Sequence, residues 1–256
     1  GGSSKARLLT CSDYTGLEIM RVLKDEVLNQ KIPLLEFVAA VELLSDAKGA
    51  CTGAVLKDLD NNRFVVVAAK TVILATGGIG RLHIQGFPTS NHFGATGDAL
   101  VLAYRLGVPL VQIDTFQYHP SGGVYPEQLV GALVTEGIRS EGGHLVNGKG
   151  ERFVNELDTR DVVSSSIIRE CEEGRGVRTS SGRVGVWLDT PLLDVEHGPG
   201  TLDKHFPAMV RQYERYQVDI RKDPVLIYPT LHYQNGGVKI DVNGETPVAN
   251  LFVAGE

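Results

Sequence analysis

Ionisable side chains that could do chemistry stand in four segments of this sequence, three of them beside glycine pairs. His119 lies just before a glycine pair, Glu136 and Arg139 lie just before another, Arg160 stands in the run TRDVVS, and His232 precedes a further glycine pair. Arginine binds carboxylates through two parallel hydrogen bonds, and histidine can donate one more. Two histidines and two arginines of this kind would form a receptor for a dicarboxylate. Glu136, three residues before Arg139, could hold that arginine in place or pass a proton.

Each of these residues also has an ordinary structural interpretation. A histidine before proline, such as His119, is often a loop residue, and Arg160 could begin an exposed helix. Glu136 and Arg139 could form a surface ion pair worth under about 1 kcal/mol. Spacing alone does not bring the four segments together, so both interpretations stay open at this point.

The elements that must position these residues follow an α/β pattern. The spacing of apolar residues predicts an amphipathic helix over 15–30, and the apolar stretch 34–44 predicts one or two strands. A hairpin with turn residues at 60–62 is expected from 53–57 and 63–69, and 71–75 has the composition of a fully buried strand. Further expected elements are a helix at 98–104, strands at 108–113 and 185–188, helices at 161–173 and 202–216, and strands at 237–241 and 251–254.

The sequence pattern changes between about residues 117 and 228, where glycine-rich loops replace the regular alternation of predicted strands and helices. This change predicts one α/β domain interrupted by an inserted α+β domain. We expect the first domain to comprise residues 1–112 and 232–256, with the insertion at 113–231.

Composition and charge exclude several classes of protein. The 256 residues are 42% hydrophobic and 22% charged, as in ordinary globular domains, and the net charge of −6 argues against a nucleic-acid binder. No apolar run approaches the roughly 18 residues of a membrane helix, so direct membrane insertion is not expected. Three widely spaced cysteines, Cys11, Cys51 and Cys171, form no metal or disulfide pattern, which predicts reduced, buried thiols, a cytoplasmic location and no metal site.

Motifs along nearly the whole chain resemble one family, the flavoprotein subunits of fumarate reductase and succinate dehydrogenase, together with L-aspartate oxidases and soluble flavin-dependent fumarate reductases. The resemblance implies an α/β fold in which a partial, Rossmann-like FAD-binding domain is interrupted by an α+β capping domain, with the substrate between them. The motifs are Thr15-Gly16, Ala75-Thr76-Gly77-Gly78, Thr96-Gly97-Asp98, Gln117-Tyr118-His119-Pro120, TEGIRSEGG from Thr135 to Gly143, NGKGERFVN from Asn147 to Asn155, RDVVS from Arg160 to Ser164, HYQNGG from His232 to Gly237 and LFVAGE from Leu251 to Glu256.

The resemblance also implies a reaction and a role for each site residue. A hydride would pass between flavin N5 and fumarate, succinate or a related dicarboxylate, while Arg160 donates or accepts the proton. Glu136 and Arg139 would relay that proton. His119 and His232 would bind and polarise the substrate carboxylates, and Ser121, where the family commonly has threonine, would also contact the substrate.

The same resemblance implies where the cofactor FAD would bind and which partners the protein has. An electron-transfer partner is expected in addition to the dicarboxylate. The residues expected to contact FAD are Val38, Ala39, Ala75, Thr76, Gly77, Gly78, Asp98 and Glu256.

The sequence departs from the family pattern in ways that leave alternatives open. It contains no GxGxxG motif for the FAD pyrophosphate, and it stops before the family's Asn-Arg-Leu stretch, so we expect the middle part of a longer flavoprotein. The alternatives to a fumarate reductase or succinate dehydrogenase are an L-aspartate oxidase-like activity and a catalytically silent binding module without flavin. A serine hydrolase is not favoured, because no GxSxG motif is present.

Overall fold

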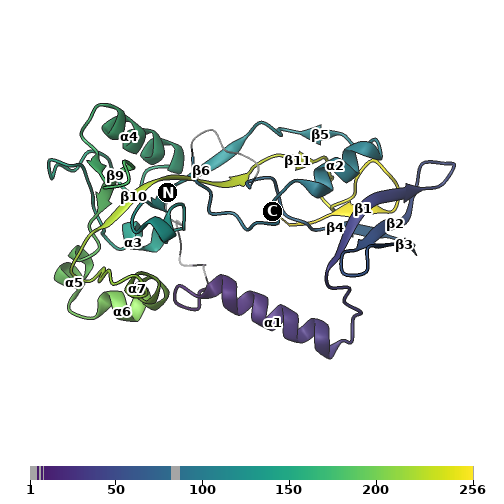
Figure 1. Ribbon diagram of the computed structural model, residues 1–256, viewed down its shortest axis with the longest axis horizontal. Helices are drawn as coiled ribbons and strands as arrows, with labels where there is room; N and C mark the ends of the chain where they lie inside the picture. The colour runs from purple at the N-terminus through teal and green to yellow at the C-terminus, as the bar shows by residue number, and fades with distance from the viewer. Residues whose placement is uncertain (1–4, 6, 8, 82–86, 256) are drawn as a thin grey trace. The chain divides into compact units, whose positions relative to one another are not determined.

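The computed structural model describes residues 5, 7, 9–81 and 87–255, which form two compact units (Figure 1). Unit 1 comprises Gly1–Ile32, Gln85–Ser90 and Tyr118–Leu231, and unit 2 comprises Pro33–Ile84, Asn91–Gln117 and His232–Glu256. That these units correspond to the two domains expected from the sequence stays a prediction. Glu256, expected near the cofactor, lies outside the described residues.

Unit 1 is built on a sheet in the order β6, β10, β9, β7, with β8 paired to β9. Its strands are β6 (Phe116–Gly123, in unit 1 from Tyr118), β7 (Leu145–Val146), β8 (Val177–Arg178), β9 (Val184–Leu188) and β10 (Val225–Gln234, in unit 1 up to Leu231). The sequence did not predict β6, because Pro120 and the glycines after it are disfavoured in strands. Proline is accepted here because β6 is the edge of the sheet, where an N–H is not needed on the open side.

The helices of unit 1 cover the sheet and enclose its apolar core. They are α1 (Thr15–Asn29), the short 3-10 helix η1 (Glu127–Leu129), α3 (Glu136–Ser140), α4 (Arg160–Glu172), α5 (Leu192–His197), α6 (Thr201–His205) and α7 (Pro207–Glu214). The core includes Ile138, Val163, Ile167, Leu188 and Ile227, all fully buried. A single helix over 202–216 was wrong: Phe206 interrupts it and Pro207 begins α7, because proline suits a first helical turn but not a helix interior.

The segment before α1 is fixed to α6 and α7, within unit 1. The Asp13 carboxylate accepts hydrogen bonds from the N–H groups of Ala208 (3.0 Å) and Met209 (2.9 Å). It therefore caps α7 from 195 residues away in sequence, in place of a local cap that α7 lacks. Helix α1 itself matches its predicted bounds, but it buries none of its residues among the described part of the chain.

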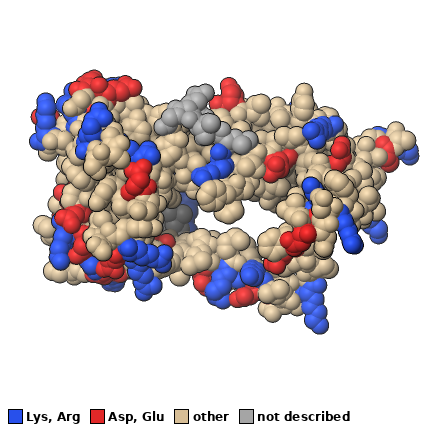
Figure 2. Space-filling view, in the orientation of Figure 1, with Lys and Arg blue, Asp and Glu red and all other residues tan. Residues whose placement is uncertain are grey.

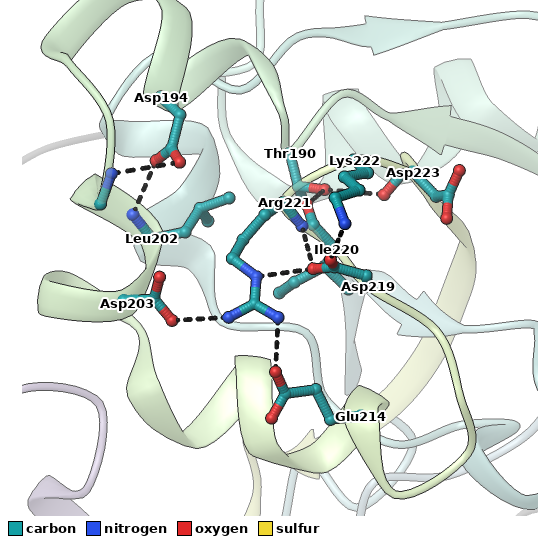
Figure 3. A network of polar contacts seen from close by, with 11 residues as sticks. Thr190, Asp194, Leu202, Asp203, Glu214, Asp219, Ile220, Arg221, Lys222 and Asp223 are labelled. Atoms are coloured by element: carbon teal, nitrogen blue, oxygen red, sulfur yellow. Dashed lines mark hydrogen bonds and ion pairs between the residues drawn. The ribbon is translucent and has the colours of Figure 1, made fainter.

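A group of ion pairs around Arg221 joins α6, α7 and the loop before β10 (Figure 3). The Arg221 guanidinium contacts Asp219 at 2.6 Å, Asp203 at 2.9 Å and also Glu214. Beside it, the Thr190 hydroxyl donates to the carbonyl of Ile220 at 2.6 Å. These contacts hold α6 and α7 in place relative to each other.

Unit 2 contains an antiparallel sheet of β1 (Val38–Ser45), β2 (Cys51–Asp58) and β3 (Arg63–Ala68), which includes the predicted hairpin. Two further pairs are β4 (Val72–Leu74) parallel to β12 (Leu251–Val253), and β5 (Leu110–Val111) antiparallel to β11 (Gly237–Val238). Helix α2 (Asp98–Arg105) lies beside β1 and β11 (Figure 1). Its buried residues join Leu74 and Leu251 in a second core.

Charged side chains of both signs are interspersed on the face shown in Figure 2, without a continuous basic stripe there. This distribution agrees with the net charge of −6. None of the described helices is both long enough and apolar enough to cross a membrane.

Candidate functional site

Three elements of unit 1 bring together most of the ionisable residues singled out in the sequence. Strand β6 carries His119 and Ser121, α3 begins at Glu136 and carries Arg139, and α4 begins at Arg160. Residues three apart in a helix share a face, so Glu136 and Arg139 point the same way. Residues from three separate sequence motifs therefore lie together in one cluster.

Arg160 and Glu136 form a close ion pair across α3 and α4. The Arg160 guanidinium contacts Oε2 of Glu136 through Nη2 at 2.7 Å and through Nε at 3.1 Å. Both side chains are 32% exposed, so solvent reaches the pair without separating it. Arg160 does begin a helix, as the ordinary interpretation expected, but its side chain is engaged rather than freely solvated.

Arg139 is buried, with only 2% of its surface exposed, so the interpretation of a surface ion pair is wrong. Its Nε donates to the Ser121 hydroxyl at 3.1 Å and its Nη1 donates to the carbonyl of Glu156. Its Nη2 lies 3.5 Å from Oε1 of Glu136 and has no hydrogen-bond partner within the described residues. Burial lowers the pKa of Arg139, partly opposed by the carboxylate of Glu136.

His119 is buried beside this pair, and its ring has a defined orientation. The N–H of Ser121 donates to Nδ1 at 3.1 Å, so a neutral ring carries its proton on Nε2. Nε2 lies 3.8 Å from Oε2 of Glu136, with its N–H available to stabilise the charged form of that carboxylate. The pKa of Glu136 is held well below its ordinary value, first by His119 and then, against the effect of burial, by Arg160 and Arg139.

Sequence reasoning missed Glu156, a carboxylate only 3% exposed. Its Oε1 accepts a hydrogen bond from the Leu145 N–H at 2.8 Å, and both oxygens accept from Arg152. Burial alone would raise the pKa of Glu156, but Arg152 and the Leu145 N–H outweigh it and the net shift is downward. The signal available in the sequence was the four-residue spacing of Arg152 and Glu156.

His232 belongs to unit 2, in the last part of β10, and is therefore described with that unit. Its ring packs edge-on against Tyr233, with 5.4 Å between ring centroids. Its carbonyl accepts a hydrogen bond from the Asn91 side chain at 2.6 Å. These contacts fix the backbone at His232.

The glycine-rich loop expected to contact FAD follows the parallel strand pair of unit 2. The segment Ala75-Thr76-Gly77 is exposed and comes directly after β4, while Ala254 follows β12 and donates its N–H to the Leu74 carbonyl at 2.9 Å. Ligands of α/β folds bind outside the carboxyl ends of parallel strands. Small residues with accessible backbone at this edge fit a large cofactor that approaches the main chain closely.

Asp98 lies at the first position of α2, where its exposed carboxylate accepts a hydrogen bond from the Thr96 hydroxyl at 2.8 Å. Gly97, just before it, has a left-handed φ of 77°. A Cβ at this position would lie 2.8 Å from Cγ2 of Ile79, which follows the Gly77-Gly78 pair. Glycine is thus required to bring Asp98 next to the loop after β4, and the Gly97 N–H donates to the Gly78 carbonyl at 3.2 Å.

Val38 and Ala39 are not joined to this loop by the contacts of unit 2. They begin β1 and pair with Asp58 and Lys57, whereas Leu43, at the other end of β1, packs in the core with Leu74. Their contact with FAD stays a prediction.

The cysteines differ from the expectation in one respect. Cys51 is buried and Cys171 is partly buried, but Cys11 is exposed, so the prediction of three buried thiols was wrong for that residue. Cys11 precedes α1 in the segment that contacts α6 and α7, where little protein covers it. Among the described residues, no group of three or more His, Cys, Asp or Glu side chains could hold a metal ion.

Comparison with known proteins identifies the family of this chain. The model of the FAD binding domain family matches residues 1–256. An uncharacterised FAD-dependent oxidoreductase of Methanocaldococcus jannaschii is 40% identical, with 100% of this chain and 46% of that protein covered. One subunit of the fumarate reductase (CoM/CoB) of Methanothermobacter marburgensis is 39% identical, with 100% of this chain and 46% of that subunit covered.

Solved structures agree with the sequence comparison. A quinol-fumarate reductase structure with menaquinol molecules has a TM-score of 0.84 and 31% sequence identity, covering 96% of this chain and 44% of that chain. The predicted α/β fold class is thereby confirmed. The chain spans less than half the length of these similar proteins. From the match over its whole length, the chain belongs to the FAD binding domain family, whose cofactor is FAD.

Proposed function

We propose that the protein is an FAD-dependent oxidoreductase that interconverts fumarate and succinate or a related dicarboxylate. The single observation that carries the proposal is the contiguous set Arg160, Glu136 and Arg139, with separations of 2.7 Å and 3.5 Å between successive charged groups. Buried Arg139, the Glu136 carboxylate and partly exposed Arg160 lie one after another in space and form a path along which a proton can move. The similarity to a protein named fumarate reductase supports the same assignment.

Bound FAD would supply the hydride that reduces the substrate. In the direction of reduction, the carbon–carbon double bond gains that hydride on one carbon and a proton on the other. Arg160 gives this proton from its guanidinium. Glu136, 2.7 Å away, takes a proton from Arg139 and passes it to Arg160, which restores the Arg160 guanidinium. Oxidation of succinate follows the same steps in reverse.

An ordinary arginine is a poor acid, because its guanidinium pKa exceeds about 12. The rest of the cluster bears on how the proton that Arg160 gives up is replaced. Burial lowers the pKa of Arg139, which eases release of its proton toward Glu136. The carboxylate of Glu136 is ionised at neutral pH, because its pKa is lowered, so it has room for that proton; the same shift makes it a weak base, which passes the proton on to Arg160 rather than keeping it.

The histidines and Ser121 complete the proposed site. His119 and His232 would bind the carboxylates of the substrate, and the bond from the Ser121 N–H to Nδ1 places the proton of a neutral His119 ring on Nε2. Ser121 is fully buried and its hydroxyl already accepts from Arg139, so this structure supports a role in holding Arg139 at least as well as substrate contact.

The FAD would be held by the backbone of Ala75, Thr76, Gly77 and Gly78 and by the carboxylate of Asp98. The accessible small residues after β4 and the fixed position of Asp98 support this assignment. We further propose an electron-transfer partner, since one similar protein is named as one subunit of a larger enzyme. A cytoplasmic location is part of the proposal and rests on three free cysteines.

The proposal is tested by Arg160→Lys in the flavin-loaded holoenzyme, assayed for fumarate reduction with a reduced dye as electron donor. We expect loss of turnover with FAD retained, because lysine keeps the charge but not the paired contacts to Glu136. Near-normal fumarate reduction by the variant would remove Arg160 as proton donor. A wild-type protein that binds no FAD would instead support the silent binding module.

A further inference from the structure

We propose that Glu156 is a positioning residue that sets the geometry of both arginines in the site, an inference that rests on the proposed function above. Glu156 would not touch the substrate. Its main-chain carbonyl would orient Arg139. The short turn that follows it would set the position of Arg160.

The Glu156 side chain is firmly anchored. Its carboxylate is 3% exposed and accepts hydrogen bonds from Arg152 and from the main-chain N–H of Leu145 in β7. A buried carboxylate with this many donors is held in position, since moving it would break these hydrogen bonds away from water. Its side chain therefore ties the segment before α4 to the edge of the sheet.

The main chain of the anchored residue holds Arg139. The Glu156 carbonyl accepts a hydrogen bond from Nη1 of Arg139, whose Nε is held by Ser121. With Nη1 and Nε both fixed, Nη2 of Arg139 is directed toward Oε1 of Glu136 at 3.5 Å. The orientation of the buried guanidinium thus depends on where the Glu156 carbonyl lies.

A short turn links Glu156 to Arg160, which stands four residues later. Within this turn, Asn155 accepts hydrogen bonds from the N–H groups of Leu157 and Asp158. Arg160 then begins α4 and reaches Glu136. One anchored residue accordingly holds Arg139 and sets the starting point of the helix that carries Arg160.

The proposed mechanism offers no other use for the Glu156 carboxylate. Its two oxygens are occupied by the Leu145 N–H and by Arg152, whose side chain is 51% exposed. A carboxylate needed only for fold stability could be replaced without effect on proton transfer. Replacing a carboxylate that positions the arginines would slow proton transfer. The value of kcat therefore distinguishes a positioning role from a purely stabilising one.

The test uses Glu156→Gln in the flavin-loaded holoenzyme, with Glu170→Gln as the matched control. Glu170 is also a buried carboxylate in an ion pair, with Arg175 at 2.6 Å, and it lies on α4 away from the cluster. We expect Glu156→Gln to lower kcat about 10- to 100-fold, with KM and FAD content unchanged, because misplacing a reacting group by about 1 Å costs on that order. The control should lose thermal stability and keep kcat.

Two further variants keep the test decisive. Arg152→Met removes the main partner of Glu156 from a half-exposed position, and we expect it to lower kcat in the same way even if Glu156→Gln fails to fold. The double variant should lose no more than either single one, because both changes act through one anchor. A crystal structure of either variant should show Nη1 of Arg139 displaced from the carbonyl of residue 156.

The outcomes separate this inference from the proposed function. Unchanged kcat in both Glu156→Gln and Arg152→Met, while Arg160→Lys is inactive, would overturn the positioning role and leave the proposed function standing. Full activity of Arg160→Lys would overturn the proposed function itself. A kcat loss in Glu170→Gln equal to that in Glu156→Gln would reduce the effect to general destabilisation and refute the inference.

Discussion

Removing the charge of Glu136 should destabilise the folded protein at neutral pH, and the structure gives the size of the effect. Glu136→Gln leaves Arg139 buried without its main counter-charge, since Nη2 of Arg139 lies 3.5 Å from Oε1 of Glu136 and the Glu156 carboxylate acts on it more weakly. At an effective dielectric constant near 20, opposite charges at this separation attract by about 5 kcal/mol. Most of this gain is offset by the cost of removing the carboxylate from water.

The net loss of stability is therefore expected to be about 1–3 kcal/mol, the usual cost of leaving one buried polar partner unsatisfied. The lost contact with Arg160 adds little, because both of those side chains are 32% exposed and solvent screens their interaction. Urea unfolding at pH 7, followed by circular dichroism, measures the difference between variant and wild type. Glu127→Gln is the matched control, because it breaks a well-exposed ion pair with Arg183 and should leave the midpoint unchanged.

The pH dependence provides the second arm of this experiment. The pKa of Glu136 is lowered in the folded state, so its contribution to stability is complete above the ordinary value of 4.5 and is lost as pH falls toward the lowered value. The gap between wild type and Glu136→Gln should consequently narrow below pH 4.5. Equal unfolding free energies at pH 7, or a gap that stays constant on acidification, would refute the reasoning.

Four other changes have defined expected results. Glu170→Gln should flatten the loss of thermal stability of the wild type between pH 4.5 and about 2, because Arg175 lowers the pKa of Glu170 to about 2; an unaltered profile would contradict this. Gly97→Ala should lower the free energy of unfolding in urea by about 1–3 kcal/mol, because residue 97 has a left-handed φ of 77°; an unchanged free energy would contradict this backbone geometry. Asp13→Ala should cost about 1 kcal/mol by uncapping α7, with an unchanged melting temperature as the contrary outcome. His232→Ala should weaken dicarboxylate binding about tenfold in calorimetry of the holoenzyme, and an unchanged Kd would remove it from the site.

The sequence predicted the elements whose own residues favour one structure. Helix α1 and the hairpin of β2 and β3 follow from the periodicity of their apolar residues and from the turn residues between the strands. Strand β6 could not be predicted, because its proline and glycines are acceptable only at a sheet edge, and that edge is created by residues of β10 more than 100 positions later. Local propensity carries no information about such a partner.

The site residues also divide into those that the sequence predicted and those that depend on contacts formed only in the fold. Motif order pointed to Glu136, Arg139 and Arg160, and the contacts between them agree with that grouping. Glu156 could not be found in this way, because its importance lies in a main-chain carbonyl and a buried carboxylate rather than in a motif. The sequence could not predict the burial of Arg139 either, since a Glu and an Arg three residues apart are usual on exposed helices.

The most direct test of the proton relay is the rate at which fumarate reoxidises the reduced flavin of the holoenzyme, measured by stopped-flow absorbance. Wild type, Arg160→Lys and Glu136→Gln are compared, and dioxygen serves as an acceptor that requires no relay to a substrate carbon. The account predicts that fumarate reoxidises both variants at least about 100-fold more slowly than wild type, as expected when a positioned proton donor is lost, while reoxidation by dioxygen is unchanged. Equal rates with fumarate in all three proteins would contradict it.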